Sequence, residues 1–500
     1  MILKRLSEIL GTFDKVELKR FERFLRSDYF NTNERIYKLF KALKKFYPIF
    51  DDPRLTNEHL FKELYGQKKF DDKTFRYLLS ELMTLSEKYL SLSNIEEDKQ
   101  VMEKQLIKRL LAKRLFTQAQ SHLKEIDKKL EGNFVISGSD INNRCDYLES
   151  WHNLFFFSGK QDPVTDITKK IEGGEYIVFR AIIELSHIYQ NLIAVTPNYN
   201  IELPEDNLFF TFLRNLDYKA MYVNLDNIEN SFKTNKYKYE LVIAFKIYVS
   251  FMITFLDEKD KAYFYKMKKS VAKYSRLFNR EELQNLHIML VSCCEIKRKI
   301  FGEHEYLVSQ FEILKSALSL NLYSQYKGQY MEVPLFSKIF ETAFALKEYS
   351  WAEDFINRYK KELSPEFCDD IYHYSNAELN FKKKQFESAH ESLSKIKSLK
   401  YFQLKIKVRN LTLMIYYELN YIEQAIALLN TYTHFLINNK RVRAEQKETE
   451  LNFLSFLKEL LKLKETRKDN GILKSLRNDI SKCGQLVRKD WLLEKAGELT

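Results

Sequence analysis

The stretch that decides the fold is Phe386-Glu-Ser-Ala-His-Glu-Ser-Leu-Ser-Lys-Ile396. A large apolar residue stands three positions before the small Ala389, and further large apolar residues follow that alanine at +4 and +7. A small side chain lets one helix approach another closely, the residue before it plugs the turn, and the +4/+7 pair faces the next unit. We therefore interpret this stretch as the start of the second helix of a helix-turn-helix unit.

The same pattern recurs at three other places in the chain. It is found at Phe116-Thr-Gln-Ala119, Tyr349-Ser-Trp-Ala352 and Ile422-Glu-Gln-Ala425. The last three alanines are 37 (352 to 389) and 36 (389 to 425) residues apart. A period of this length is typical of a helical solenoid, in which stacked helix pairs bury a continuous core.

The amino-acid composition also favours an all-α fold. The chain has 12 Gly and 7 Pro among 500 residues, whereas soluble proteins average about 7% Gly and 5% Pro. Strand-rich folds need these residues for tight turns, which argues against a sandwich, barrel or propeller. A hydrophobic content of 45% and an aromatic content of 14% exclude disorder. Residues 366–470 contain neither Gly nor Pro, so we expect turns made by polar residues with apolar plugs such as Phe386 and Tyr421.

With these junctions, the chain resembles the tetratricopeptide-repeat (TPR) superfamily, whose unit is an antiparallel helix pair with a small residue near the start of its second helix. The resemblance covers about 331–439 and 101–130. The period here is longer than the family's 34 residues, and the family's closing proline is missing. The resemblance implies an α-solenoid, a TPR-like right-handed superhelix of antiparallel helix pairs.

Helix signals divide the chain into three predicted parts. Residues 1–95 form a small N-terminal helical domain of short helices, in which Asp14 and Glu17 have the spacing of a capping box. Residues 96–439 form the TPR-like array, with connections outside the helical stack at 132–140 and 196–206. Residues 440–500 form a C-terminal capping helix pair with a turn at 468–471, because a solenoid needs a polar terminal element to cover its open end.

Charge and cysteine content predict a soluble, cytoplasmic protein. The excess of 81 Lys+Arg over 69 Asp+Glu is spread along the chain, as on solvated helical surfaces. The five cysteines lack any C-x-x-C spacing, which argues against a disulfide framework or a zinc knuckle. The first residues lack the apolar core of a signal peptide. The longest apolar stretch, 241–256, is shorter than a membrane span and contains Lys246, so we expect no membrane span.

The sequence contains no recognisable catalytic, cofactor or metal motif. Neither phosphate-binding pattern, G-x-x-x-x-G-K-[ST] or G-x-G-x-x-G, is present, and there is no G-x-S-x-G elbow. No two of the nine histidines are four residues apart, as a helical metal site would require. We therefore expect a protein that is not an enzyme, with no catalytic residues, no cofactor and no metal.

Recognition of a protein or peptide is the function that this pattern favours. Solenoids present an extended surface that can hold a peptide or a partner helix, and so act as scaffolds. Asn376 and Asn380 share one helical face, and so do Lys405 and Arg409. Two amides beside two cations can fix the backbone and a carboxylate of an extended peptide. The alternative interpretation of these four residues is an ordinary solvated face.

The rival hypothesis is a nucleic-acid-binding or regulatory protein that uses its basic surface and its N-terminal domain. The predicted helix after Asp72 carries Lys73 and Arg76 in its first turn, as a recognition helix does, and the chain is basic overall. Glu81 and Glu87 follow on the same helix and weaken this interpretation.

Overall fold

The computed structural model describes residues 2–130, 135–159, 163–195, 207–302, 304–324, 329–465 and 470–499. Over these ranges the protein is all-α, as predicted, with 24 α-helices and no strand. Two isolated bridges, Ile136 with Phe278 and Met331 with Leu363, are the β-type pairings recorded there. The predicted connections at 132–140 and 196–206 and the turn at 468–471 fall wholly or partly outside the described residues.

The chain divides into two compact units, which we describe separately. The first comprises residues 1–127 and 146–170, and the second comprises 128–145 and 171–500. Two helices, α8 (Gly138–Ser158) and α9 (Pro163–Val195), are divided between the units, and α7 (Phe116–Leu130) has its last three residues in the second. The other helices of the first unit are α1 (Ile2–Thr12), α2 (Lys15–Leu25), α3 (Glu34–Lys44), α4 (Asn57–Tyr65), α5 (Asp72–Glu97), α6 (Lys99–Ala112) and nearly all of α7 (Phe116–Leu130).

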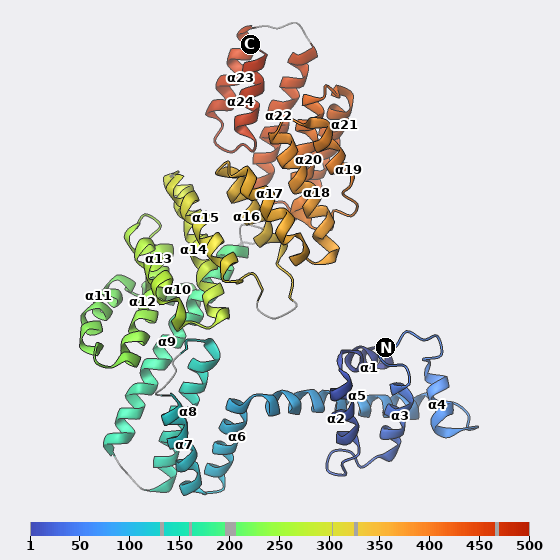
Figure 1. Cartoon of the computed structure of the whole chain (residues 1–500), viewed down its shortest axis with the longest axis vertical. Coiled ribbons are helices and arrows are strands. Elements are labelled where there is room, and N and C mark those ends of the chain that lie inside the picture. Colours follow the sequence, from blue (N-terminus) through green and yellow to red (C-terminus); the bar gives the residue numbers. More distant parts are fainter. Residues whose placement is uncertain are drawn as a thin grey trace. The chain divides into compact units, whose positions relative to one another are not determined.

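The second unit contains the remaining helices, which Figure 1 labels. They are α10 (Leu208–Asn215), α11 (Tyr218–Glu229), α12 (Lys236–Leu256), α13 (Ala262–Tyr274), α14 (Arg280–Phe301), α15 (His304–Ser319), α16 (Val333–Ala345), α17 (Tyr349–Tyr359), α18 (Pro365–Lys382), α19 (Phe386–Ser394), α20 (Phe402–Glu418), α21 (Ile422–Asn438), α22 (Ala444–Glu465), α23 (Asn470–Lys482) and α24 (Lys489–Glu498).

The start of α2 has the capping box that the sequence predicts. An Asp14 carboxylate oxygen accepts from the Glu17 amide at 2.8 Å, and Glu17 Oε2 accepts from the Asp14 amide at 2.7 Å. These bonds satisfy amides that have no partner within the helix. Tyr89 of α5 reaches back to this helix and packs its ring 5.2 Å from that of Phe21. Tyr89 thus joins α5 to the aromatic core of the short helices.

All four predicted junctions are helix starts. Helices α7, α17, α19 and α21 begin at the large apolar residue of the motif, three positions before its alanine. The four alanines are completely buried. The residues at +4 are also buried, and they are Leu123, Ile356, Leu393 and Leu429. A larger side chain at the alanine position would therefore push the two helices apart.

The turn before each junction has one backbone geometry. The residue five positions before the alanine is left-handed, with φ of 59° at Arg114, 64° at Lys347, 57° at Lys384 and 61° at Asn420. The residue after the left-handed one donates its amide hydrogen to the carbonyl that lies five positions earlier in the chain. This arrangement ends a helix by satisfying its last carbonyls. These bonds are Leu115 N to Leu110 O (2.9 Å), Glu348 N to Ala343 O (3.0 Å), Gln385 N to Asn380 O (2.9 Å) and Tyr421 N to Tyr416 O (2.8 Å).

Consecutive helices of the second unit pack against each other along most of its length. From α14 to α22 every helix contacts the next one in the sequence, and α16, α18 and α20 also contact one another in order. One core runs through this region, from Phe311 to Ala496. The last predicted helix is divided into α23 and α24 at 483–488, a segment that contains Gly484, a poor helix former.

One helix is long and apolar enough to cross a bilayer by length and composition. It is the segment 238–256 of α12, and 78% of its 18-residue apolar window is buried inside the protein. Lys246 lies in this segment and pairs with Asp226 and Glu229 of α11. A core helix of a soluble protein has the same properties.

The buried junction alanines lead to a first prediction. Replacing Ala389 with Leu should lower the free energy of unfolding by about 1–3 kcal/mol, because the added atoms overpack a closed helix contact. Chemical denaturation followed by circular dichroism measures this change. The matched control is Ala427→Leu, on the exposed face of α21, which should change stability by less than about 0.5 kcal/mol. Equal effects of the two substitutions would contradict the role of Ala389.

The left-handed turns lead to a second prediction. Replacing the exposed Lys384 with Gly should raise the free energy of unfolding by about 1 kcal/mol, because glycine adopts a positive φ without the cost that a Cβ imposes. The same denaturation experiment tests it. Ala427→Gly, inside a helix, should lower stability by about 1 kcal/mol. If Lys384→Gly lowered stability as Ala427→Gly does, the positive φ of Lys384 would not be a cost that glycine relieves, and the prediction would be wrong.

Candidate functional site

The two predicted amides lie on the face of α18 that contacts neighbouring odd-numbered helices. The Asn376 side chain donates to the carbonyl of Tyr372, one turn earlier, at 3.1 Å. The Asn380 side chain donates to Ser392 Oγ of α19 at 3.4 Å, and the Tyr372 hydroxyl donates to Asn357 of α17 at 3.2 Å. This face of α18 is therefore engaged in packing between helix pairs.

The two predicted cations lie on α20, and Arg409 contacts α21. Arg409 donates to the Lys405 carbonyl at 3.3 Å, and its guanidinium lies 4.3 Å from the ring centroid of Phe435. Burial lowers the pKa of Arg409, since a low-dielectric environment disfavours its charge. Asn380 and Arg409 thus each contact a neighbouring helix, α19 and α21 respectively. Binding of a peptide by these four residues stays a prediction.

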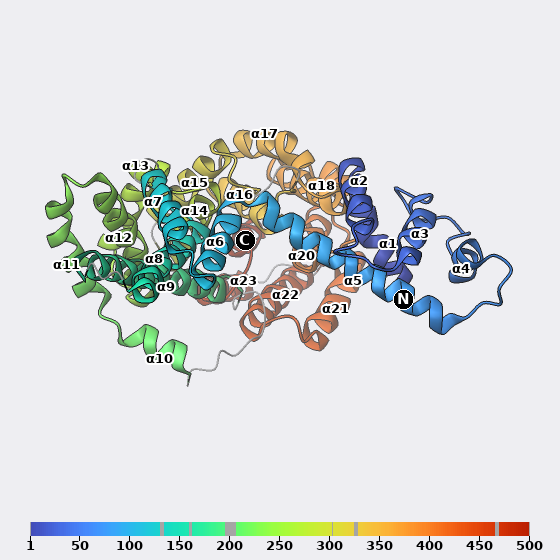
Figure 2. The ribbon, with the colours of Figure 1, turned by 90° about the horizontal axis from the view of Figure 1, so that it is seen from below.

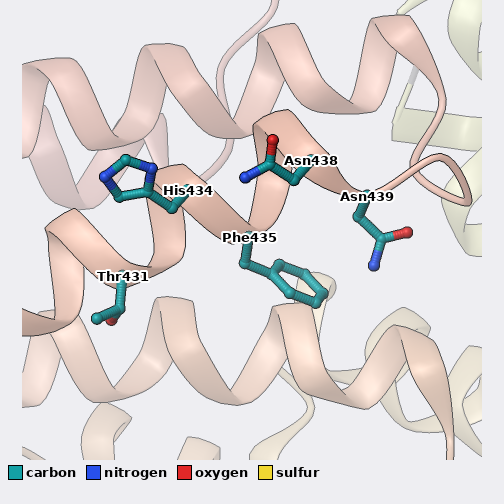
Figure 3. A pocket seen from close by; sticks show the side chains of 5 residues that line it. All are labelled: Thr431, His434, Phe435, Asn438 and Asn439. Carbon is teal, nitrogen blue, oxygen red and sulfur yellow. The ribbon is translucent and has the colours of Figure 1, made fainter.

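A shallow hollow lies beside this pair on the surface of α21. It is lined by Thr431, His434, Phe435, Asn438 and Asn439, with a volume of about 350 Å³ (Figure 3). It is open to solvent, and its walls come from one helix and the residue that follows it. Binding sites for small molecules are usually enclosed and apolar, so this hollow does not define a site.

A different face of the even-numbered helices holds a row of carboxylates. Residues two positions apart point about 200° apart on a helix, so Glu378 faces away from the side on which Asn376 and Asn380 lie. Each of the helices α16, α18, α20 and α22 contributes one glutamate, and each of these glutamates interacts with Arg488 or with Lys495. We call these four residues the acidic face: Glu341, Glu378, Glu418 and Glu450.

Glu378 is the most specifically partnered member of the acidic face. Arg488, 110 residues later in the chain, holds it with both terminal guanidinium nitrogens, and the Tyr374 hydroxyl donates to it at 2.5 Å. Burial disfavours the carboxylate, which is only 3% exposed, but the charge and hydrogen bonds of Arg488 outweigh this effect and lower the pKa of Glu378. The carboxylate therefore stays charged inside the protein.

Glu450 of α22 has a contrasting environment. Its carboxylate accepts from Asn410 at 2.7 Å and from the Tyr432 hydroxyl at 3.2 Å. Burial raises the pKa of Glu450, and the two neutral hydrogen-bond donors only partly offset that effect. The acidic face thus contains one carboxyl held ionised by a cation and one whose charge is disfavoured.

Glu418 and Glu341 complete the row. Glu418 accepts from the indole nitrogen of Trp491 at 2.8 Å and from Lys495 Nζ at 2.9 Å, and both of these residues belong to α24. Glu341 of α16 pairs with Lys407 of α20. Figures 1 and 2 both show α22 between α21 and α23, and α24 packs on α22 and α23.

The sequence contains little signal for the acidic face. Glu378 stands between apolar residues in a helix, which hints at a buried carboxyl, but its partner Arg488 is far away in the chain. Spacing along one helix shows which residues share a face, and only the folded chain shows what that face contacts.

The first turn of α5, on which the nucleic-acid hypothesis rests, is also partly engaged. Arg76 pairs with Asp72 of the same helix at 2.9 Å, and Tyr77 donates to Glu81. Asp71 caps the helix N-terminus and accepts from the Lys73 amide. Two acidic side chains therefore stand beside the basic residues that would meet a phosphate.

Comparison with known proteins gives no assignment: no protein-family model, no curated protein and no solved structure matches this chain. In the part of the chain that the structure describes, no group of three or more His, Cys, Asp or Glu side chains is placed to hold a metal ion. The geometry of the acidic face is that of a polar surface that binds a guanidinium, an indole and an ammonium group.

The pairing of Glu378 leads to a third prediction. Glu378→Gln should lower the free energy of unfolding at pH 7 by about 3 kcal/mol, because it leaves Arg488 without its carboxylate. The pKa of Glu378 is lowered by folding, so its contribution is present above the unfolded value of about 4.3 and is lost as the pH falls through the folded value. The difference between wild type and variant should therefore shrink below about pH 4.

Denaturation across a pH series measures this difference, and the same helix offers a control. Glu366 also belongs to α18 and pairs with Lys400, but its side chain is 46% exposed. Glu366→Gln should change stability by less than about 1 kcal/mol, as is usual for exposed ion pairs. A loss for Glu378→Gln that is equally small, or that does not depend on pH, would contradict this account of the Arg488 contact.

Proposed function

We propose that this protein is a non-enzymatic scaffold for protein-protein interaction, which binds a peptide or partner helix on the acidic face of a TPR-like, right-handed solenoid. The observation that carries the proposal is the set of contacts on Glu378 and Glu418. A guanidinium, an indole and an ammonium group from one short helical segment are bound there by side chains of two different helices. Side chains anchored along one side of a helix are the means by which a groove recognises a partner helix.

Two features support the solenoid arrangement. The four junctions share a left-handed turn, a buried alanine and a helix start at the same position of the motif. Helix α18 contacts both α16 and α20, as expected where one helix of each pair lies beside the same helix of the next pair. Stacked pairs of this kind create an extended surface lined by one helix of each pair.

We also propose that the protein functions in the cytoplasm, which is a reducing compartment. Cys293, Cys294, Cys368 and Cys483 form no disulfide, and Cys293 and Cys294 are buried. Burial raises the pKa of both thiols, so neither has the thiolate character of a reactive cysteine. Buried thiols of this kind suit a protein that folds without disulfides.

A pull-down with matched charge-reversal variants is the fourth prediction and tests the function. The full chain is used as bait in a lysate of its source cells, with and without nuclease, and bound proteins are quantified by mass spectrometry. We expect partners that survive nuclease and that Glu341→Lys depletes several-fold. Glu353→Lys is the control, because Glu341 and Glu353 are each 45% exposed and each pairs with one lysine.

Two outcomes would overturn the proposal. Partners that disappear with nuclease, together with salt-dependent binding to DNA or RNA, would favour the nucleic-acid hypothesis. Partners that both variants retain equally would show that the acidic face is not the interaction surface. Circular dichroism of both variants checks that the charge reversals leave the helices intact.

A further inference from the structure

The C-terminal segment 484–499 meets the acidic face as a ligand meets a groove. Arg488 contacts Glu378, whereas Trp491 and Lys495 both contact Glu418. The three residues are spaced i, i+3 and i+7, which places them along one side of α24 and the turn before it. Such spacing is typical of the anchor residues of a helix bound in a groove.

The segment also packs on the common core through apolar side chains, among them Leu486, Val487, Leu493 and Leu499. On α24, Leu492 and Ala496 are completely buried and Trp491 is 7% exposed. The Trp491 ring meets the ring of Tyr417 edge to face, with the centroids 5.3 Å apart. Helix α24 packs on α22 and on α23, while Arg488 and Trp491 extend its contacts to α18 and α20. The attachment of the segment is therefore both apolar and polar, and its polar part comes from Arg488, Trp491 and Lys495.

Arg488 is held in a conformation that its own side chain does not favour. Its φ is 57° and its ψ is 28°, a left-handed geometry that residues with a Cβ adopt rarely, and as the N-cap of α24 it makes no side-chain capping bond. Its guanidinium is committed to Glu378 instead. The pairing thus fixes the position where α24 begins.

The ion pair of Arg488 with Glu378 also determines which chemical group could take the place of segment 484–499. Glu378 is 3% exposed, and a buried carboxylate without a cation is strongly disfavoured. Departure of Arg488 is therefore favourable only when another group neutralises Glu378. A second guanidinium does this with the same two parallel bonds, whereas a lysine ammonium does not reproduce that geometry.

We propose that segment 484–499 is a displaceable internal ligand of the acidic face, and that the partner of this face is a helical peptide with an arginine followed three residues later by an aromatic residue. This inference rests on the proposed scaffold function and specifies its partner and its regulation. Because the segment is tethered to the face, its effective concentration is on the order of millimolar. A partner therefore binds only if its affinity and concentration are high enough to compete with the tethered segment.

A binding experiment with the segment itself as probe is the fifth prediction. A fluorescent synthetic peptide with the sequence of residues 484–499 is titrated into the full chain and followed by anisotropy. We expect weak binding to the wild type, and binding at least tenfold tighter to the double variant Arg488→Ala/Trp491→Ala, in which the internal segment is weakened. Adding Glu378→Gln to that variant should weaken binding about 30-fold, since it removes one partner of a buried charge pair.

A second peptide tests the chemistry of the partner. The same sequence with Arg488→Lys should bind the double variant about tenfold more weakly, because the bidentate contact is lost. The inference is overturned if the folded double variant binds the peptide no more tightly than the wild type, or if Glu378→Gln leaves its affinity unchanged.

Hydrogen exchange on the wild-type chain keeps the inference testable if the double variant does not fold. The amides of α24 should exchange at least tenfold faster than the amides of α20, because the segment opens without global unfolding. Equal rates in the two helices would show that α24 is a permanent part of the core. Neither measurement needs a cellular partner, so a failed pull-down with intact peptide binding would count against the scaffold function alone.

Discussion

The structure of the second unit depends on how each helix pair turns. At the best junctions one residue adopts a left-handed backbone, and the amide after it closes the end of the preceding helix. For residues with a Cβ this conformation costs about 1–2 kcal/mol, and tight packing offsets the cost because the alanine five positions later is completely buried. The turn and the alanine act together: the first sets the direction of the second helix, and the second lets it approach.

The electrostatic properties of the protein are local and are not captured by its net charge. The chain carries an excess of 12 positive charges, yet the most specific polar contacts of its last helices are made by glutamates. Their environments differ, because Arg488 lowers the pKa of Glu378 against the effect of burial, whereas burial dominates at Glu450 and raises its pKa. A buried carboxylate with a fixed cationic partner contributes more to specificity than to stability, which is how we interpret Glu378.

Local patterns in the sequence predicted the local structure well. The capping box at Asp14 and the helix start at Phe386 follow from side chains that act within one turn, and the structure confirms both. The left-handed Lys384 could not be predicted, because lysine has no preference for that backbone region and the turn is imposed by packing. The pairing of Asn376 with Asn380 on one face was predictable, but the direction of that face depends on helices that are distant in the sequence, and so does the acidic face.

The separation of Arg488 and Glu378 along the chain has a consequence for biosynthesis. Helices that pack against their sequence neighbours can form as soon as they leave the ribosome, since all their contacts are local. Glu378 can form its ion pair only after Arg488, which is 110 positions later in the chain, has been synthesised. At a synthesis rate of about 5–20 residues per second, that interval lasts roughly 5–20 s. During this time the nascent chain carries a carboxylate without its own arginine, and a chaperone or an early partner that offers a guanidinium meets no internal competitor.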